Sequence, residues 1–75
     1  ERFRVEVGQV DRVKPGNLVG AIANETGLQG RMIGRIQIFD NFSFVDLPKG
    51  MPEGIFNDLK RLKVMNKELK INRAT

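Results

Sequence analysis

Apolar and polar residues alternate with a period of two in several short stretches of the chain, a pattern typical of β-strands that are buried on one face. These stretches span residues 2–8, 33–39, 42–47 and 68–72. Two other stretches have helical spacing, and each begins at a proline, which is favoured at the first helical position. These prolines are Pro15 and Pro52. The pattern therefore predicts the element order β-α-β-β-α-β.

The first predicted helix combines apolar residues at helical spacing with a glycine at its end. Leu18 and Ile22 lie on its apolar side, and Gly27 stands where a left-handed terminal residue is expected. A further glycine inside the helix, Gly20, costs about 1 kcal/mol relative to alanine. We expect a close approach of the helix to the sheet to compensate for it. The second helix has an apolar stripe formed by Ile55, Leu59 and Leu62.

Residues 33–47 predict a β-hairpin whose strands are joined at Asp40 and Asn41, two residues that tolerate left-handed backbone. A two-residue turn sets Phe39 opposite Phe42. Alternation places the aliphatic residues on one face, namely Ile36, Ile38, Val45 and Leu47. It places the charged and aromatic residues on the other face, namely Arg35, Gln37, Phe39, Phe42, Phe44 and Asp46. Such a face is costly to expose unless a partner binds there.

The predicted order corresponds to an α+β fold, the ferredoxin-like βαββαβ sandwich, in which two helices cover one face of a four-stranded antiparallel sheet. The other face of the sheet stays open. With 75 residues, the chain is expected to be a single domain, 1–75, with one core. The residues expected to be buried together are Val5, Leu18, Ile22, Ile36, Ile38, Val45, Leu59 and Ile71.

Composition favours an anionic partner. The formal net charge is +4 and the isoelectric point is near 10.0, although lysine and arginine are dispersed, so that the fold must assemble any basic patch. The sequence has no cysteine, which excludes disulfides and thiolate metal sites and suits a reducing, cytoplasmic setting. No apolar run is long enough to span a bilayer, so we expect no membrane association.

The residues that most enzymes use for acid–base and nucleophilic chemistry are missing from the chain. It contains no histidine and no cysteine. The segment 27–30 has two glycines but lacks the lysine and Ser/Thr of a phosphate-binding loop. No loop has the spacing of a calcium site. We therefore expect no catalytic residues, no metal and no cofactor.

Aromatic rings on an open sheet of a basic protein favour the stacking of nucleic-acid bases. The expected sheet surface consists of Arg4, Arg35, Phe39, Phe42, Phe44 and Lys70. The expected phosphate contacts are loop residues, namely Arg12, Lys14 and Arg31. Solubility alone is an alternative explanation for these three cations, and burial under another segment or in a dimer contact is an alternative for one or more of the rings.

Residues 40–47 resemble the octamer on the third strand of RNA-recognition motifs, with Phe42 and Phe44 at its two stacking positions. Arg4 stands where those motifs have a first-strand aromatic. Three further segments are similar to the DbpA-type RNA-binding domain of bacterial DEAD-box RNA helicases, and the last resembles the cold-shock (DeaD/CsdA) group. These segments are residues 19–25, 33–36 and 45–52.

This resemblance extends from Arg2 to Arg73 and implies a non-catalytic accessory domain from the C-terminal region of such a helicase. The implied partners are structured RNA, above all ribosomal RNA, and the helicase core in cis. The implied processes are ribosome assembly, RNA unwinding or RNA turnover.

Two other functions fit the same topology. One is a regulatory module that binds small metabolites and dimerises through its sheet edges, and the other is a protein-docking domain that uses the aromatic face. The RNA-binding module is expected to be a monomer, which gel filtration distinguishes from the dimerising class.

Overall fold

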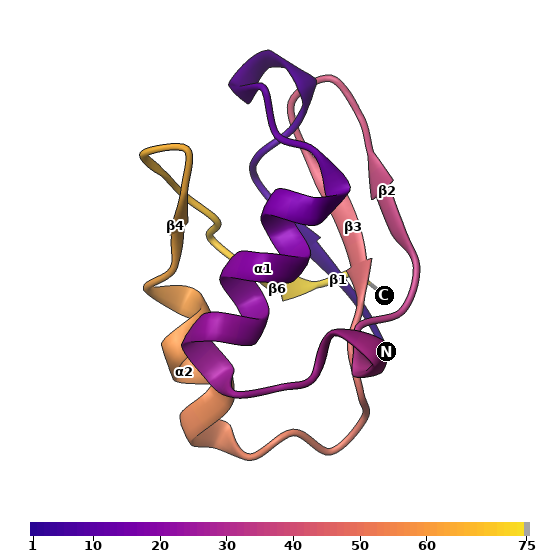
Figure 1. Cartoon of the computed structure of the whole chain (residues 1–75), viewed down its shortest axis with the longest axis vertical. Coiled ribbons are helices and arrows are strands. Elements are labelled where there is room, and N and C mark those ends of the chain that lie inside the picture. Colours follow the sequence, from indigo (N-terminus) through magenta and orange to yellow (C-terminus); the bar gives the residue numbers. More distant parts are fainter. Residues whose placement is uncertain (75) are drawn as a thin grey trace.

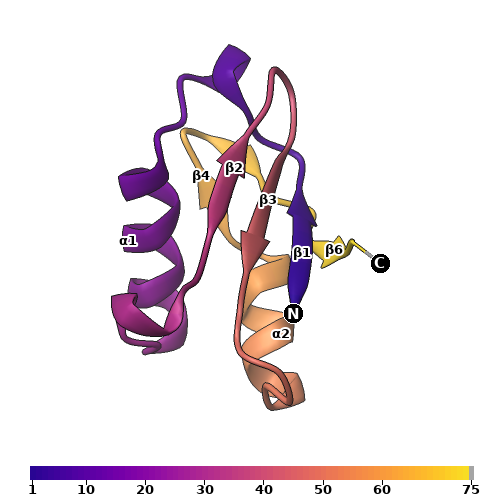
Figure 2. The same ribbon diagram turned by 90° about the vertical axis from the view of Figure 1, so that its right-hand side faces the viewer.

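The computed structural model describes residues 1–74 and has an α+β architecture (Figures 1 and 2). Four antiparallel strands form a sheet in the order β2-β3-β1-β6. They are β1 (Arg2–Val5), β2 (Ile36–Ile38), β3 (Ser43–Asp46) and β6 (Asn72–Arg73). The helices α1 (Pro15–Thr26) and α2 (Glu53–Lys60) share a core with the inward face of this sheet. The predicted class, sheet and pair of helices are confirmed.

The segment after α2 differs from the prediction of a single final strand over residues 68–72. Two short strands, β4 (Lys63–Val64) and β5 (Lys67–Glu68), form a separate hairpin before β6 begins. Met65 and Asn66 adopt φ angles of 54° and 66°, which make a left-handed two-residue turn. The chain therefore follows the predicted order β-α-β-β-α up to α2. Three short strands then stand where one final strand was predicted.

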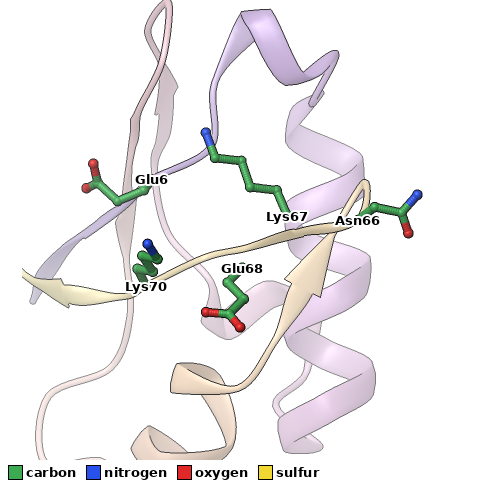
Figure 3. A pocket seen from close by; sticks show the side chains of 5 residues that line it. All are labelled: Glu6, Asn66, Lys67, Glu68 and Lys70. Atoms are coloured by element: carbon green, nitrogen blue, oxygen red, sulfur yellow. The ribbon is translucent and has the colours of Figure 1, made fainter.

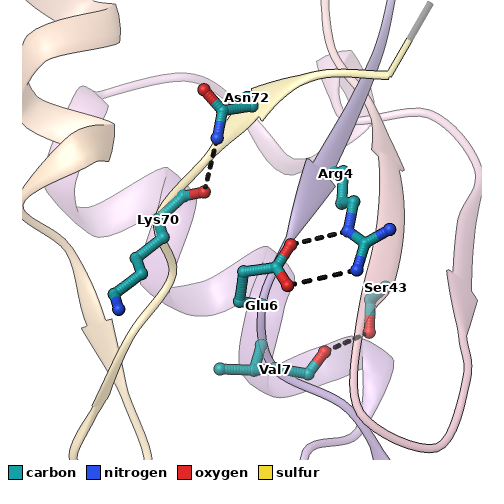
Figure 4. Close-up of polar contacts among 6 residues, drawn as sticks. All are labelled: Arg4, Glu6, Val7, Ser43, Lys70 and Asn72. Carbon is teal, nitrogen blue, oxygen red and sulfur yellow. Dashed lines mark hydrogen bonds and ion pairs between the residues drawn. The ribbon is translucent and has the colours of Figure 1, made fainter.

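A bulge in front of β6 explains why the last strand is short. Arg4 lies opposite Asn72, but the amide of Glu6 donates to the carbonyl of Leu69 at 2.7 Å, so the register shifts by one residue between these points. Lys70 is the extra residue, and its φ of 48° is left-handed. The side chain of Asn72 donates to the Lys70 carbonyl at 3.3 Å and holds the bend (Figure 4).

The core contains most of the residues predicted from the alternation. Those fully buried as predicted are Val5, Leu18, Ile22, Val45, Leu59 and Ile71. Ile36 and Ile38 are only partly buried, because β2 is an edge strand, but both pack against the core. Leu69, which was not among the predicted core residues, is also fully buried at 0% exposure, two residues before Ile71.

The helix boundaries follow the local signals in the sequence. α1 begins at Pro15 and is followed by Gly27, whose φ of 75° is left-handed. The prediction that Gly20 allows a close approach of α1 to the sheet is wrong, because Gly20 is exposed and a Cβ there would meet nothing within 4 Å.

The close approach occurs instead at Gly8. A Cβ on Gly8 would lie 2.5 Å from the carbonyl oxygen of Phe39, at the tip of the β2–β3 hairpin. The short helix η1 (Gln9–Asp11) lies against this tip, and the amide of Gln9 donates to the Phe39 carbonyl at 2.9 Å. Asp40 and Asn41 therefore join the strands without the left-handed backbone that their identities suggested. The turn still has two residues, and the amides of Gln9 and Val10 hold it by donating to the carbonyls of Phe39 and Asp40, each at 2.9 Å.

Candidate nucleic-acid interface

The register of the sheet sets the composition of its open face. Ile36 pairs with Val45 and Gln37 with Phe44, and the amide of Phe39 donates to the Phe42 carbonyl at 2.9 Å. The predicted pairing of Phe39 with Phe42 is therefore confirmed. β1 adds its own outward residues to this face, because Arg4 lies opposite Phe44.

Three phenylalanine rings meet on the open face, and we call them the phenylalanine cluster: Phe39, Phe42 and Phe44. The rings of Phe39 and Phe42 stack with centroids 4.9 Å apart and planes at 19°. Phe44 packs edge-on against both, at 5.6 Å from Phe39 and 5.4 Å from Phe42. Phe39 is 40% exposed, and the other two rings are half-buried. Each ring pair contributes about 0.5–1.5 kcal/mol beyond the area it buries.

Two arginines of β1 lie over the cluster. The guanidinium carbon of Arg4 is 4.2 Å from the centroid of the Phe42 ring, and that of Arg2 is 5.5 Å from the Phe44 ring. Each arginine leans diagonally across the sheet, Arg2 toward Phe44 of β3 and Arg4 toward Phe42 just before β3, a distance within reach of long side chains. Arg4 was predicted on this surface, whereas Arg2 was not. The alternation of β1, which puts both arginines on one face, was the signal that could have revealed Arg2.

A carboxylate holds each arginine in place. Glu6 accepts hydrogen bonds from Nε and Nη2 of Arg4 at 2.6 and 3.2 Å (Figure 4). Asp46 accepts one from Nε of Arg2 at 3.4 Å. The hydrogen bond from Arg4 lowers the pKa of Glu6, and the nearby charges of Arg4, Lys67 and Lys70 act in the same direction. Glu6 in turn raises the pKa of Arg4. Both groups are therefore charged at neutral pH.

A hollow of about 600 Å³ adjoins the open face where β1 faces the β4–β5 hairpin, and we call it the side hollow. Its lining residues are Glu6, Asn66, Lys67, Glu68 and Lys70 (Figure 3). Nζ of Lys67 also lies 3.4 Å from Oδ2 of Asp11 in η1. Lys70 was predicted on the sheet surface, but its left-handed backbone places it in the lining of this hollow.

The remaining predicted cations do not form one site. Arg35 is exposed and lies across from Asp46 of β3. The amide of Asp46 donates to the Arg35 carbonyl at 2.9 Å. Arg12 and Lys14 are exposed just before α1 begins, whereas Arg31 lies in η2 (Gly30–Met32), after α1 has ended. A helix of 12 residues is about 18 Å long. The structure therefore does not bring Arg31 together with Arg12 and Lys14.

A second aromatic region lies on the helix-covered side and was missed by the sequence analysis. Nζ of Lys60 is 4.9 Å, and the guanidinium carbon of Arg73 is 5.9 Å, from the centroid of the Phe56 ring. Phe56 also packs against the buried ring of Phe3 at 5.9 Å. Glu1 pairs with Arg73 at 2.6 Å. The Phe56 ring thus packs against the core on one side, and Lys60 and Arg73 beside it line a hollow of about 350 Å³.

Within residues 1–74, no three histidine, cysteine, aspartate or glutamate side chains gather as a metal-binding group. Neither helix in that part of the chain has the length and apolar character needed to cross a membrane.

Comparison with known proteins gives a consistent result. Residues 2–73 match the family described as DbpA RNA binding domain. The chain is 39% identical over 70 residues to ATP-dependent RNA helicase DeaD of Haemophilus influenzae, covering 93% of the chain and 11% of that protein. It is 42% identical over 67 residues to the protein of the same name from Escherichia coli K12, covering 89% of the chain and 11% of that protein. The chain thus spans about one ninth of these relatives.

Proposed function

The chain belongs to the DbpA RNA-binding domain family, and from this premise we propose that it is a non-catalytic module that binds RNA through the open face of its sheet. The observation that supports this most strongly is the phenylalanine cluster with Arg2 and Arg4 over its rings. Both helices pack on the opposite side of the sheet. Aromatic rings and guanidinium planes are the groups on which unpaired RNA bases stack.

We infer that the bound RNA presents unpaired nucleotides, such as those of a hairpin loop or a junction. The major groove of an RNA duplex is too narrow for side chains to read, and its bases are stacked on one another. A surface built for stacking therefore needs bases that are already free. Lys67 and Lys70, in the side hollow beside the sheet, are placed to contact the phosphates of the same strand. Arg12 and Lys14 lie near the hairpin tip, where η1 joins α1, and extend this basic surface.

We further propose that the module tethers a DEAD-box helicase core in cis to structured RNA. The support is that the relatives are named ATP-dependent RNA helicases and that the chain matches only 11–12% of their length. Ribosomal RNA is the proposed target. The proposed process is ribosome assembly, which would take place in the cytoplasm and also under cold shock. RNA unwinding and turnover are related alternatives.

The structure gives little support to the class of modules that dimerise through sheet edges. The two edge strands of the sheet, β2 and β6, have three and two residues. Short edge strands offer few unpaired backbone groups to a second copy. We therefore propose that the isolated domain is a monomer, and gel filtration at micromolar concentration tests this directly. Docking of a protein on the aromatic face is the alternative function, and the RNA titration described next tests it.

A titration of the domain with a fluorescently labelled RNA stem–loop, whose loop has mixed sequence, tests the proposed function. A blunt duplex of equal length is the control and should bind more weakly. If about four to six phosphates are neutralised, log K should fall with log salt with a slope of about −3 to −4. Equal affinity for both RNAs would remove base stacking from the mechanism. A constant affinity between low and physiological salt, or no binding at all, would favour protein docking.

A further inference from the structure

The Phe42 ring has a neighbour on each side. β3 lies between β2 and β1, so Phe39 approaches the ring from one neighbouring strand and Arg4 from the other. The centroid of Phe39 is 4.9 Å away and the guanidinium carbon of Arg4 is 4.2 Å away. A base could reach either face of the Phe42 ring only by displacing one of these groups. The accessible ends of this stack are Phe39 and Arg4.

The hydrogen bonds of Arg4 leave its planar surface available. Glu6 bonds to Nε and Nη2, which lie along one edge of the guanidinium, at 2.6 and 3.2 Å. These bonds lie in the plane of the group, so they fix its orientation without covering its faces. The guanidinium carbon lies over the Phe42 ring at 4.2 Å from its centroid, and the Arg4 side chain is 45% exposed. A base that stacks on the exposed face would meet a group that is already oriented, which lowers the entropy lost on binding.

We propose that Arg4 is a base-stacking residue of this interface, that Phe42 supports it from below, and that Glu6 is the positioning residue that holds it there. The proposal rests on the proposed function and specifies which group the base contacts. It also explains why a carboxylate, that of Glu6, lies on a surface proposed to bind RNA. A carboxylate beside RNA opposes binding by charge alone, so a positioning role predicts the opposite sign for its removal.

Two variants and one control distinguish the proposed stacking and positioning roles from an effect of charge alone. Arg4→Lys keeps the charge and loses the plane, whereas Glu6→Gln removes one negative charge together with the bidentate contact. Glu25→Gln removes one negative charge from an exposed position on α1, far from the cluster in the fold, and serves as the charge control. Thermal unfolding of Arg4→Lys and Glu25→Gln should resemble that of the wild type, because both positions are exposed, and Glu6→Gln should melt only slightly lower, so all three variants are folded at the temperature of the titration.

The probes are the stem–loop RNA and the same RNA with abasic loop nucleotides. For the wild type, removing the bases should weaken binding by about tenfold, within the usual effect of one stacked base. Arg4→Lys should bind the intact probe about tenfold more weakly than the wild type and should respond little to base removal. Glu6→Gln should bind about two- to fivefold more weakly, whereas Glu25→Gln should bind equally well or slightly more tightly.

The outcomes distinguish this proposal from the proposed function. The proposal holds only if Arg4→Lys loses the response to base removal and Glu6→Gln weakens binding. If Arg4→Lys responds to base removal as strongly as the wild type, Arg4 contributes charge alone and the proposal fails. If Glu6→Gln binds as tightly as the wild type or more tightly, the positioning role fails. In either case, the proposed RNA-binding function still holds if the wild type binds the stem–loop RNA. A wild type that binds neither probe overturns both the proposed function and the role of Arg4 and Glu6.

Discussion

The two faces of the sheet are formed by the same strands but differ in what covers their phenylalanine rings. On the inner face, Phe3 is 1% exposed and packs within the core that the helices complete, where it meets Phe56. On the open face, Phe42 and Phe44 are covered by one another, by Phe39 and by arginine side chains. Apolar cover stabilises the fold, whereas a guanidinium cover presents a charged, planar group to a ligand. The difference indicates that the inner rings serve stability and the outer rings serve binding.

The largest expected effect comes from exchanging one ring on each face for alanine. Phe3→Ala should lower the free energy of unfolding by about 3–5 kcal/mol, because it leaves a cavity in the core. Phe44→Ala should lower it by less, about 1–3 kcal/mol, since mainly the two ring–ring contacts with Phe39 and Phe42 are lost at a half-buried position. Urea unfolding followed by circular dichroism gives both values. Equal losses would show that the open-face rings belong to the core.

A smaller effect is expected where the backbone supports the phenylalanine cluster. Gly8→Ala should destabilise the domain by about 1–3 kcal/mol, because the new Cβ would lie 2.5 Å from the Phe39 carbonyl oxygen and must displace the hairpin tip. Gly20→Ala is the matched control, and we expect it to stabilise α1 by about 0.5–1 kcal/mol, since that position is open. Thermal unfolding of both variants measures this. If Gly8→Ala were neutral, the hairpin tip would not depend on its contact with η1.

The smallest expected effect concerns pH and the pair of Arg4 with Glu6. Folding lowers the pKa of Glu6, so the pair stabilises the folded state above the unfolded value of 4.5, and this contribution disappears as the pH falls through the folded pKa. The melting temperature of the wild type should exceed that of Glu6→Gln slightly near pH 7, and the two should converge below pH 4.5. Lys67 and Lys70 also face Glu6. A difference that persists in acid would rule out the ionised pair as its cause.

The parts of the fold that depend on local signals were predictable from the sequence. Pro15 and Gly27 define α1 because each residue prefers the backbone found at its end of the helix. The β2–β3 register followed from alternation, since a shift by one residue would have turned Val45 outward. The composition of the open face at β2 and β3 followed from this register.

Features that depend on distant contacts were not predictable. The position of Arg4 over Phe42 requires the register of β1 against β3, and these residues are far apart in the chain. The β4–β5 hairpin was missed because its turn uses Met65 in a left-handed conformation, which methionine rarely adopts. The expected grouping of Arg31 with Arg12 was wrong because the helix predicted between them, 12 residues long, holds its two ends about 18 Å apart.

The most direct test of the central claim, that the open face binds RNA, is the affinity of the double variant Phe42→Ala, Phe44→Ala for the stem–loop RNA. Phe56→Ala, which changes the aromatic region on the helix-covered side, is the control, and all proteins are titrated at a temperature where circular dichroism shows them folded. We expect the double variant to lose at least about tenfold in affinity, the effect of one lost base stack, and Phe56→Ala to bind like the wild type. Full affinity in the double variant would contradict the account, and a loss of affinity in Phe56→Ala would then move the interface to the surface around α2.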